Sequence, residues 1–400
     1  MRVLDEKEIL QLPNLDEISL SNKLYKIRKC SHSVNYMLIL QLHITDYCNL
    51  QCSHCYGMCD RTEMSMVQFR RVIDDFFFFI ERHRLAARIH ITGGEPFVHK
   101  HFFEMLEYLW KNYYLKKYPF VIEILTNGTL LNADVLEKLE KYREMIYEIQ
   151  MSVDGMEETH NSIRGNDTWE RTINATTLLK EEKYRVSWSF VISKRNYFDA
   201  IGVLKLAEEL LVNRMTISRL VPLGMNAKEA VEDVLSVDEY KEIQKRVYDA
   251  ASELFERIRE GKTTTYLAMN RCDLWNLADI DYIKGQLDKI KSIPSYMVLG
   301  CACMIGKNYM VILPNGDMLA CRRLPKVLGN VFESTIGEIW RDNEFLKAIR
   351  MRSTMMEGKC RECEFYLEPA LKNLCGGGGP CMAVAQGQSI YEPDPMCWKE

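Results

Sequence analysis

Three cysteines stand close together in the stretch CNLQCSHCYG. Cys48, Cys52 and Cys55 follow one another at C-x3-C-x2-C spacing. Three thiolates can hold a 4Fe–4S cluster by three irons and leave the fourth iron open, whereas four cysteines normally saturate such a cluster. The alternative is a zinc site completed by Cys59 or by a distant ligand. The spacing therefore predicts a metal centre at this loop.

The composition of the chain excludes several classes of protein function. Fourteen cysteines are many for a chain whose start lacks a secretion signal, and in a reducing cytoplasm grouped thiols are more often metal ligands than disulfides. The net charge of −4 gives no broad basic surface for nucleic acid, and no apolar run approaches the length of a membrane span. We therefore expect a cytoplasmic protein that binds neither nucleic acid nor membrane.

Apolar runs typical of buried strands alternate with amphipathic stretches typical of helices over the first half of the chain. Ser65 and Gln68 form a capping box at the start of the first helix. The predicted strands are 36–44, 88–92, 120–125, 147–153, 185–192 and 214–221. The predicted helices are 64–83, 100–114, 130–142, 169–182 and 197–211, with a charged helix at 236–260. This alternation predicts an α/β fold of parallel βαβ units, wound as an open sheet or a barrel.

The loops at the carboxyl ends of the predicted strands carry the reactive residue types. They read CNLQCSHC, TGGEP, TNGTLL and SVDG. Ligands of such folds gather at the carboxyl ends of the strands. We therefore expect these four loops to form one site.

The cysteine loop after the first strand, together with Gly93-Gly94-Glu95-Pro96 after the second, resembles the radical SAM superfamily over residues 36–225. The resemblance implies a partial (β/α)6 TIM-like barrel. It also implies that the open iron chelates the amino and carboxylate groups of S-adenosylmethionine (SAM). An electron from the cluster then cleaves the cofactor to a 5′-deoxyadenosyl radical.

The same resemblance implies a set of cofactor contacts. Glycines would let the backbone approach SAM at Gly93 and Gly94, and the Glu95 carboxylate would pair with its ammonium group. The other residues in matching positions are Tyr47 beside the cluster, His54 for adenine, Asn127 and Ser152 for ribose, Asp154, and Arg164 for the carboxylate. For these polar loop residues a local turn-stabilising role is the alternative, and Asp154 could equally cap the following turn.

The C-terminal hundred residues hold a second set of cysteines. All eight histidines occur by His160, so a metal here would need cysteine or oxygen ligands. The pattern C-x12-G-x4-C, then CxxC, resembles the SPASM extension of radical SAM enzymes, a Cys-rich α+β domain with two auxiliary 4Fe–4S clusters. The resemblance implies one cluster on Cys360, Cys363, Cys375 and Cys397, and another on Cys303, Cys321 and Cys381.

Two features of this second set stay open. Cys301 is the candidate fourth ligand of the cluster on Cys303, but that iron can instead stay open for a substrate thiolate. A pair of structural zinc sites would also suit the spacing. The gaps between Cys363, Cys375 and Cys381, of eleven and five residues, are longer than in the usual pattern.

The combined resemblance implies four segments and a function. The segments are an N-terminal extension (1–35), a radical SAM core (36–225), a helical bridge (226–299) and a SPASM domain (300–400). The implied enzyme is a maturase that abstracts hydrogen from a ribosomally made peptide and installs a thioether or a carbon–carbon cross-link. A separate leader-binding protein can present the peptide, and flavodoxin or ferredoxin can supply electrons.

The alternatives are formylglycine formation, as in anaerobic sulfatase maturases, and dehydrogenation of a small molecule. Sulfatase maturases carry an acidic base directly after the second cysteine of the C-x12-G-x4-C element, whereas Arg322 and Arg323 stand there in this chain. Formylglycine formation is therefore less favoured. The two arginines are candidates for binding an acidic leader or a substrate carboxylate, and a solvated pair is the alternative.

Overall fold

A computed structural model describes residues 37–57, 61–224, 227–269, 273, 303, 305–367 and 375–399. The predicted N-terminal extension, part of the predicted bridge (226, 270–272 and 274–299) and Cys301 lie outside these residues. No helix of the described part is both long enough and apolar enough to cross a membrane.

A single curved sheet organises the molecule, in the strand order β10-β9-β8-β1-β2-β3-β4-β5-β6-β7. The strands are β1 (Met37–Thr45), β2 (Ala86–Gly93), β3 (Phe120–Thr126), β4 (Ile146–Ser152), β5 (Val186–Ile192), β6 (Arg214–Arg219), β7 (Tyr266–Met269), β8 (Tyr309–Ile312), β9 (Asp317–Cys321) and β10 (Leu324–Asn330). Strands β8 and β1 to β7 run parallel, and β8, β9 and β10 are joined in antiparallel pairs. The predicted six-stranded parallel core is therefore present, and C-terminal strands extend it along β1.

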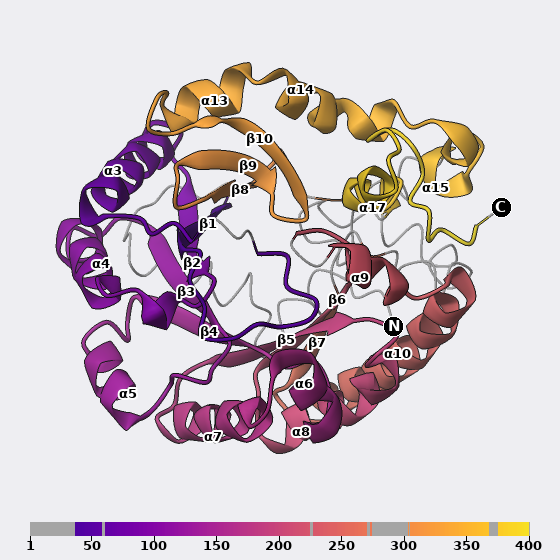
Figure 1. The fold of residues 1–400 in the computed structure, drawn as a ribbon, viewed down its shortest axis with the longest axis horizontal. Coiled ribbons are helices and arrows are strands. Elements are labelled where there is room, and N and C mark those ends of the chain that lie inside the picture. The colour runs from indigo at the N-terminus through magenta and orange to yellow at the C-terminus, as the bar shows by residue number, and fades with distance from the viewer. Residues whose placement is uncertain are drawn as a thin grey trace.

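Helices lie outside the curved sheet, and the C-terminal helices continue the ring (Figure 1). The main outer helices are α3 (Met66–Arg82), α4 (Phe102–Leu109), α5 (Ala133–Glu140), α7 (Thr168–Glu181), α8 (Ala200–Glu209), α10 (Val237–Arg259), α13 (Ile336–Asp342) and α14 (Glu344–Met351). The capping box predicted at Ser65 and Gln68 is confirmed at the start of α3. The predicted helix 100–114 is divided into α4 and a π-helical turn, Trp110–Tyr114.

The structure adds elements that the sequence pattern did not predict. Between β4 and α7 lies a short helix, α6 (Glu157–Arg164). Strand β7 lies within the segment predicted as a helical bridge and pairs with β6. The remaining small elements are α9 (Ala227–Glu232), α15 (Glu364–Leu367) and α17 (Pro380–Ala385).

The two faces of the sheet differ in polarity. On β1, the alternate residues Leu38, Leu40, Leu42 and Ile44 are buried in the hydrophobic core. The intervening Gln41 belongs to a polar row, because the strand register pairs it with His90, His90 with Glu123, and Glu123 with Glu148.

Buried ion pairs satisfy the charges of this row. Arg88 lies 2.9 Å from a carboxylate oxygen of Glu123, and Arg185 lies 3.0 Å from one of Glu148. Arg214, the first residue of β6, is also paired with Glu148. Charged groups buried this deeply need such partners to offset desolvation. These paired charges lie toward the amino ends of the strands, which leaves the loops at the carboxyl ends for chemistry.

Candidate functional site

The cysteine loop directly follows β1 and brings its three thiols together. Burial raises the pKa of the Cys52 thiol, the Arg164 guanidinium opposes this rise, and a thiolate at Cys55 adds to it. The backbone amide of Leu50 donates to the sulfur of Cys48 at 3.4 Å, and that of Gly57 donates to Cys55 at 3.3 Å. Amide donors aimed at sulfur favour the thiolate form that binds iron. The residues of this loop therefore fit a cluster bound by three thiolates.

The two glycines of the TGGEP loop lie against the backbone of the cysteine loop. Gly94 donates to the carbonyl of Thr45 at 2.7 Å, and Glu95 donates to that of Tyr47 at 2.8 Å. A Cβ atom at Gly94 would lie 2.3 Å from the Tyr47 carbonyl oxygen, and one at Gly93, where φ is +154°, would lie 2.2 Å from that of Thr45. The sequence predicts an approach to the cofactor at these glycines, whereas the neighbour that the structure shows is the loop carrying the cysteines.

Replacing Gly94 by alanine is expected to displace this loop, because a backbone carbonyl cannot yield as a flexible side chain does. We expect the anaerobically reconstituted variant to lose about four iron atoms per chain, the content of one 4Fe–4S cluster, in a colorimetric iron assay. Gly202→Ala in α8 is the matched control, because its added Cβ meets only ordinary contacts, at 3.6 Å from Met156. Full iron content in the Gly94 variant would contradict this reading.

Glu95 links the second and third strand-end loops. Its side chain is fully buried and accepts hydrogen bonds from the amide of Phe97 at 3.1 Å, the hydroxyl of Thr126 at 2.8 Å and the amide of Asn127 at 2.8 Å. Burial raises the pKa of Glu95 to about 7, although the three donors oppose the shift. The Asn127 side chain in turn donates to the side chain of Asn49 at 2.9 Å, within the cysteine loop. Both residues thus position the loop that holds the thiols.

Asp154 is the centre of a buried polar cluster at the end of β4. Its carboxylate accepts from Arg164 at 2.6 Å and from the amide of Val191 at 2.8 Å, and it lies 3.2 Å from a ring nitrogen of His54. Arg164 also reaches the sulfur of Cys52 at 3.8 Å. Burial alone would raise the pKa of Asp154, but Arg164 and His54 outweigh it and hold that pKa well below its usual range. Asp154 therefore fixes two side chains beside the thiols, and it does not cap the following turn.

The substitution Asp154→Asn is expected to lower SAM cleavage about 10- to 100-fold, the usual loss when a group that orients metal-site residues is removed. Neutralising the carboxylate releases His54 and leaves the Arg164 guanidinium without its counter-charge. The measurement is the rate of 5′-deoxyadenosine formation over a range of SAM concentrations. Glu140→Gln, at an exposed carboxylate paired with Arg143, is the control. An unchanged rate in the Asp154→Asn variant would show that Asp154 positions nothing that matters to cleavage.

The other two predicted SAM contacts lie at the same edge of the sheet. Ser152 ends β4, where it pairs with Ser189 of β5. Tyr47 is 43% exposed, and its carbonyl accepts the Glu95 amide. The structure thus brings all the predicted cofactor contacts to the carboxyl ends of β1 to β4 and to α6.

The C-terminal cysteines form two groups. Burial raises the pKa of Cys360 to about 11, and thiolates at Cys397 and Cys363 add to the rise. Burial also raises the pKa of Cys375, to about 12, and thiolates at Cys397 and Cys360 add to this rise. These four thiols therefore lie close together.

The second group joins β9 to α17. Burial raises the pKa of Cys321 to about 11, and a thiolate at Cys381 adds to this rise. Cys303, also described, is partly buried, while Cys301 lies outside the described residues. Within the described ranges, no three His, Cys, Asp or Glu side chains are arranged to hold one metal ion. The grouping of Cys360, Cys363, Cys375 and Cys397 and the pairing of Cys321 with Cys381 occur in the two predicted ligand sets, whose roles stay predictions.

Arg322 and Arg323 do not form a solvated pair. Arg322 is buried, donates to the carbonyl of Tyr56 at 3.2 Å and lies over the ring of that residue at 5.3 Å. Arg323 pairs with Asp273 at 3.0 Å. Because Tyr56 follows Cys55 and Arg322 follows Cys321, this contact joins the loop of the first cysteine set to the strand end of the second.

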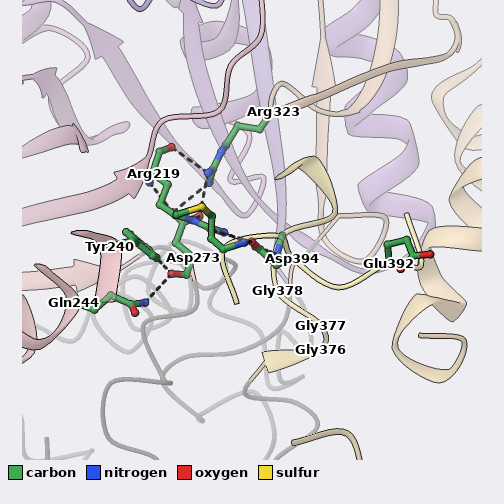
Figure 2. Close-up of polar contacts among 12 residues, drawn as sticks. Arg219, Tyr240, Gln244, Asp273, Arg323, Gly376, Gly377, Gly378, Glu392 and Asp394 are labelled. Carbon is green, nitrogen blue, oxygen red and sulfur yellow. Dashed lines mark hydrogen bonds and ion pairs between the residues drawn. The ribbon is translucent and has the colours of Figure 1, made fainter. Parts of the chain in front are cut away.

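A second buried network, drawn in Figure 2, ties the C-terminal tail to the sheet. Arg219, at the end of β6, donates to both carboxylate oxygens of Asp394 at 3.0 and 2.6 Å and pairs with Asp273 at 3.1 Å. Asp394 also accepts from the amide of Gly379 at 3.0 Å. No local sequence pattern points to Arg219 or Asp394, because the two residues lie 175 positions apart along the chain.

Comparison with known proteins agrees with this geometry. Residues 42–207 match the model of the radical SAM superfamily, and residues 301–364 match that of SPASM, an iron–sulfur cluster-binding domain, so that the two together match more than half of the chain. The chain is 25% identical over 363 residues to an AdoMet-dependent heme synthase of Methanosarcina barkeri, covering 90% of this chain and 95% of that protein.

Two further relatives cover nearly the whole chain. The mycofactocin maturase MftC of Mycobacterium tuberculosis is 25% identical over 382 residues, covering 93% of this chain and 85% of that protein. The crystal structure of Streptococcus suis SuiB shares the fold with a TM-score of 0.67 at 18% identity, covering 94% of this chain and 81% of SuiB. The resemblance inferred from the cysteine loop and GGEP is confirmed: the chain is an enzyme of the radical SAM superfamily that carries a SPASM iron–sulfur cluster-binding domain.

Proposed function

We propose that this enzyme is a peptide maturase, which generates a 5′-deoxyadenosyl radical from SAM, abstracts hydrogen from a ribosomally made peptide and installs a thioether or carbon–carbon cross-link. The observation that carries the proposal is the contact between the two cysteine regions. Arg322, next to Cys321, reaches Tyr56, next to Cys55. An auxiliary cluster in that position would lie close enough to the radical site to accept the electron left on the substrate after hydrogen abstraction.

The residues around the first loop are suited to hold the cofactor. Cys48, Cys52 and Cys55 would bind three irons of a 4Fe–4S cluster, which supplies the electron for SAM cleavage when bound. Glu95 would pair with the SAM ammonium group, and Arg164 with its carboxylate. The remaining contacts that we propose are Tyr47 beside the cluster, His54 at adenine, and Asn127 and Ser152 at ribose. The fixed orientation of Asp154, His54 and Arg164 means that the protein side of this site is preformed.

Two auxiliary 4Fe–4S clusters would occupy the C-terminal groups. We propose Cys360, Cys363, Cys375 and Cys397 for one cluster and Cys303, Cys321 and Cys381 for the other, with Cys301 or a substrate thiolate as the remaining ligand of the second. Four cysteine thiolates are the usual ligands of a closed 4Fe–4S cluster.

Arg322 is the proposed contact for a carboxylate of the peptide or its leader. Its Nε atom is buried and makes no hydrogen bond among the described residues, and the same is true of Nε2 of His43. Burial lowers the pKa of His43 to about 3, and the charge of Arg322 contributes to the shift. A substrate carboxylate would satisfy both nitrogen atoms.

A second candidate function is the modification of a tetrapyrrole. The observation that favours it is the identity to the heme synthase of Methanosarcina barkeri, which equals the identity to MftC. Formylglycine formation remains less favoured, since no carboxylate follows Cys321. The proposed partners are the precursor peptide, a leader-presenting protein, and flavodoxin or ferredoxin as electron donor.

The deciding experiment is anaerobic co-expression with each short peptide that an open reading frame beside the gene encodes, followed by mass spectrometry. A product lighter by two hydrogens supports cross-linking. A parallel incubation of the purified enzyme with SAM, dithionite and iron coproporphyrin III tests the second candidate. An unmodified peptide together with a converted porphyrin would overturn the maturase proposal.

A further inference from the structure

Arg352 is an arginine buried among backbone carbonyl groups. Its side chain is 4% exposed and lies in a short 3-10 turn, Arg352–Thr354, directly after α14. The guanidinium donates to the carbonyls of Gly376 at 2.5 Å, Gly377 at 3.1 Å and Gly378 at 3.2 Å. It also donates to the carbonyls of Glu392, at 3.3 Å, and of Ile390. Within the described part of the chain, no Asp or Glu forms a salt bridge with this cation.

The glycine loop is shaped to hold this cation. Gly376, Gly377 and Gly378 have φ values of +57°, +81° and +72°, a conformation that strongly favours glycine. A Cβ atom at Gly377 would lie 2.2 Å from Met356 and 3.3 Å from a guanidinium nitrogen of Arg352. The three labelled glycines lie together on the tail that carries Asp394 (Figure 2). Carbonyl dipoles thus take the place of a paired carboxylate, and the Asp394 carboxylate, whose charge also acts on Arg352, is itself paired with Arg219.

The loop also places that charge among the auxiliary cysteines. Gly376 directly follows Cys375, and Cys360 lies in the next 3-10 turn after Arg352, Gly358–Arg361. Burial lowers the pKa of Arg352, and negative charge on Cys303 and Cys360 opposes that shift. The Asp394 carboxylate and Cys375 oppose it as well, to smaller extents. The cation is therefore near thiols of both proposed auxiliary clusters.

We propose that Arg352 positions the CGGGGPC loop and, through its charge, which is held by carbonyl groups, favours the one-electron-reduced form of the cluster bound by Cys360, Cys363, Cys375 and Cys397. The inference rests on the proposed function, because it requires that this cluster is present. The reduction potential of an iron–sulfur cluster depends on the net charge and hydrogen bonds around it. A buried positive charge raises that potential and makes the cluster a better acceptor of the electron left on the substrate.

The test compares three variants by redox titration with dithionite, followed by electron paramagnetic resonance, on the reconstituted full-length protein without substrate. Arg352→Met removes the charge and the donors, and Arg352→Lys keeps the charge. Arg350→Met is the matched control, because Arg350 is also bound to carbonyls, those of Gly306 at 2.7 Å and Trp340 at 2.8 Å.

In the methionine variant we expect the reduction equilibrium of the auxiliary cluster to become at least tenfold less favourable, which is about 59 mV for one electron. The lysine variant and the Arg350 control should stay near the wild-type potential. Wild-type potential in an iron-replete Arg352→Met protein overturns the inference. If the methionine variant fails to load iron, the lysine variant decides. A wild-type reduction potential in the lysine variant supports the inference. A tenfold less favourable reduction equilibrium, despite the retained charge, overturns it. About four irons in the wild-type protein would overturn the proposed auxiliary clusters and this inference together.

Discussion

Alanine at Cys48, Cys52 or Cys55 is expected to abolish the formation of 5′-deoxyadenosine. Each thiol occupies one of three positions that can bind iron, and the loop that carries them is held in place by close contacts, such as that of Gly94 with the Tyr47 carbonyl. With one thiolate removed, the cluster cannot be held by three irons while the fourth remains open for SAM. The measurement is liquid chromatography of the nucleoside products after anaerobic incubation with SAM and dithionite.

Two further sets of variants test whether the loss of SAM cleavage is specific to the three-cysteine loop. Alanine at Cys30, to which no role is assigned, should leave cleavage unchanged. Alanine at Cys360 and Cys363 should preserve SAM cleavage but stop peptide modification, because the auxiliary group is separate from the three-cysteine loop. Normal cleavage in the Cys52 variant would contradict the assignment of this loop.

The substitution Asp394→Asn is expected to cause the second large effect, a loss of folding stability. The carboxylate is 1% exposed and forms a bidentate pair with Arg219, which is 4% exposed. Breaking one side of a buried pair leaves the other charge without a partner and costs about 3–5 kcal/mol. Because Asp394 also accepts the amide of Met396 at 2.9 Å, just before Cys397, we expect the variant to lose iron from the auxiliary site as well.

A urea denaturation series followed by tryptophan fluorescence measures the loss of stability, and an iron assay measures the loading. The control is Glu344→Gln, at an exposed pair with Lys347 at 2.6 Å, where surface ion pairs contribute only about 0–1 kcal/mol. Equal stability of the Asp394→Asn and Glu344→Gln variants would show that the Arg219–Asp394 pair does not hold the tail to the sheet.

The parallel core of strands β1 to β6 was predictable from the sequence because these strands are nearly continuous apolar runs. On β3, six of the seven residues are buried, which is typical of a parallel strand covered on both faces. Helix α6 was missed because it is short and polar, and buries only His160 and Ile163. The extension of the sheet by β8 was not predictable, since β8 pairs with β1 across more than 260 residues of sequence.

The residues of the site were predictable by type, whereas their partners were not. The loops supplied Glu95, Asp154 and Arg164 as candidates, but a sequence does not show that Asp154 joins His54 to Arg164. Arg352 had no local signal, because its donors are satisfied by a glycine loop more than 20 residues away. Long-range pairing of this kind depends on how the elements pack and not on propensity or periodicity.

The most direct test of the account is the iron content of the anaerobically reconstituted enzyme. Three 4Fe–4S clusters predict about twelve irons per chain, and removal of Cys48, Cys52 and Cys55 together should leave about eight. About four irons in the wild-type protein, falling to none in the triple variant, would contradict the proposal that the C-terminal cysteines hold two auxiliary clusters.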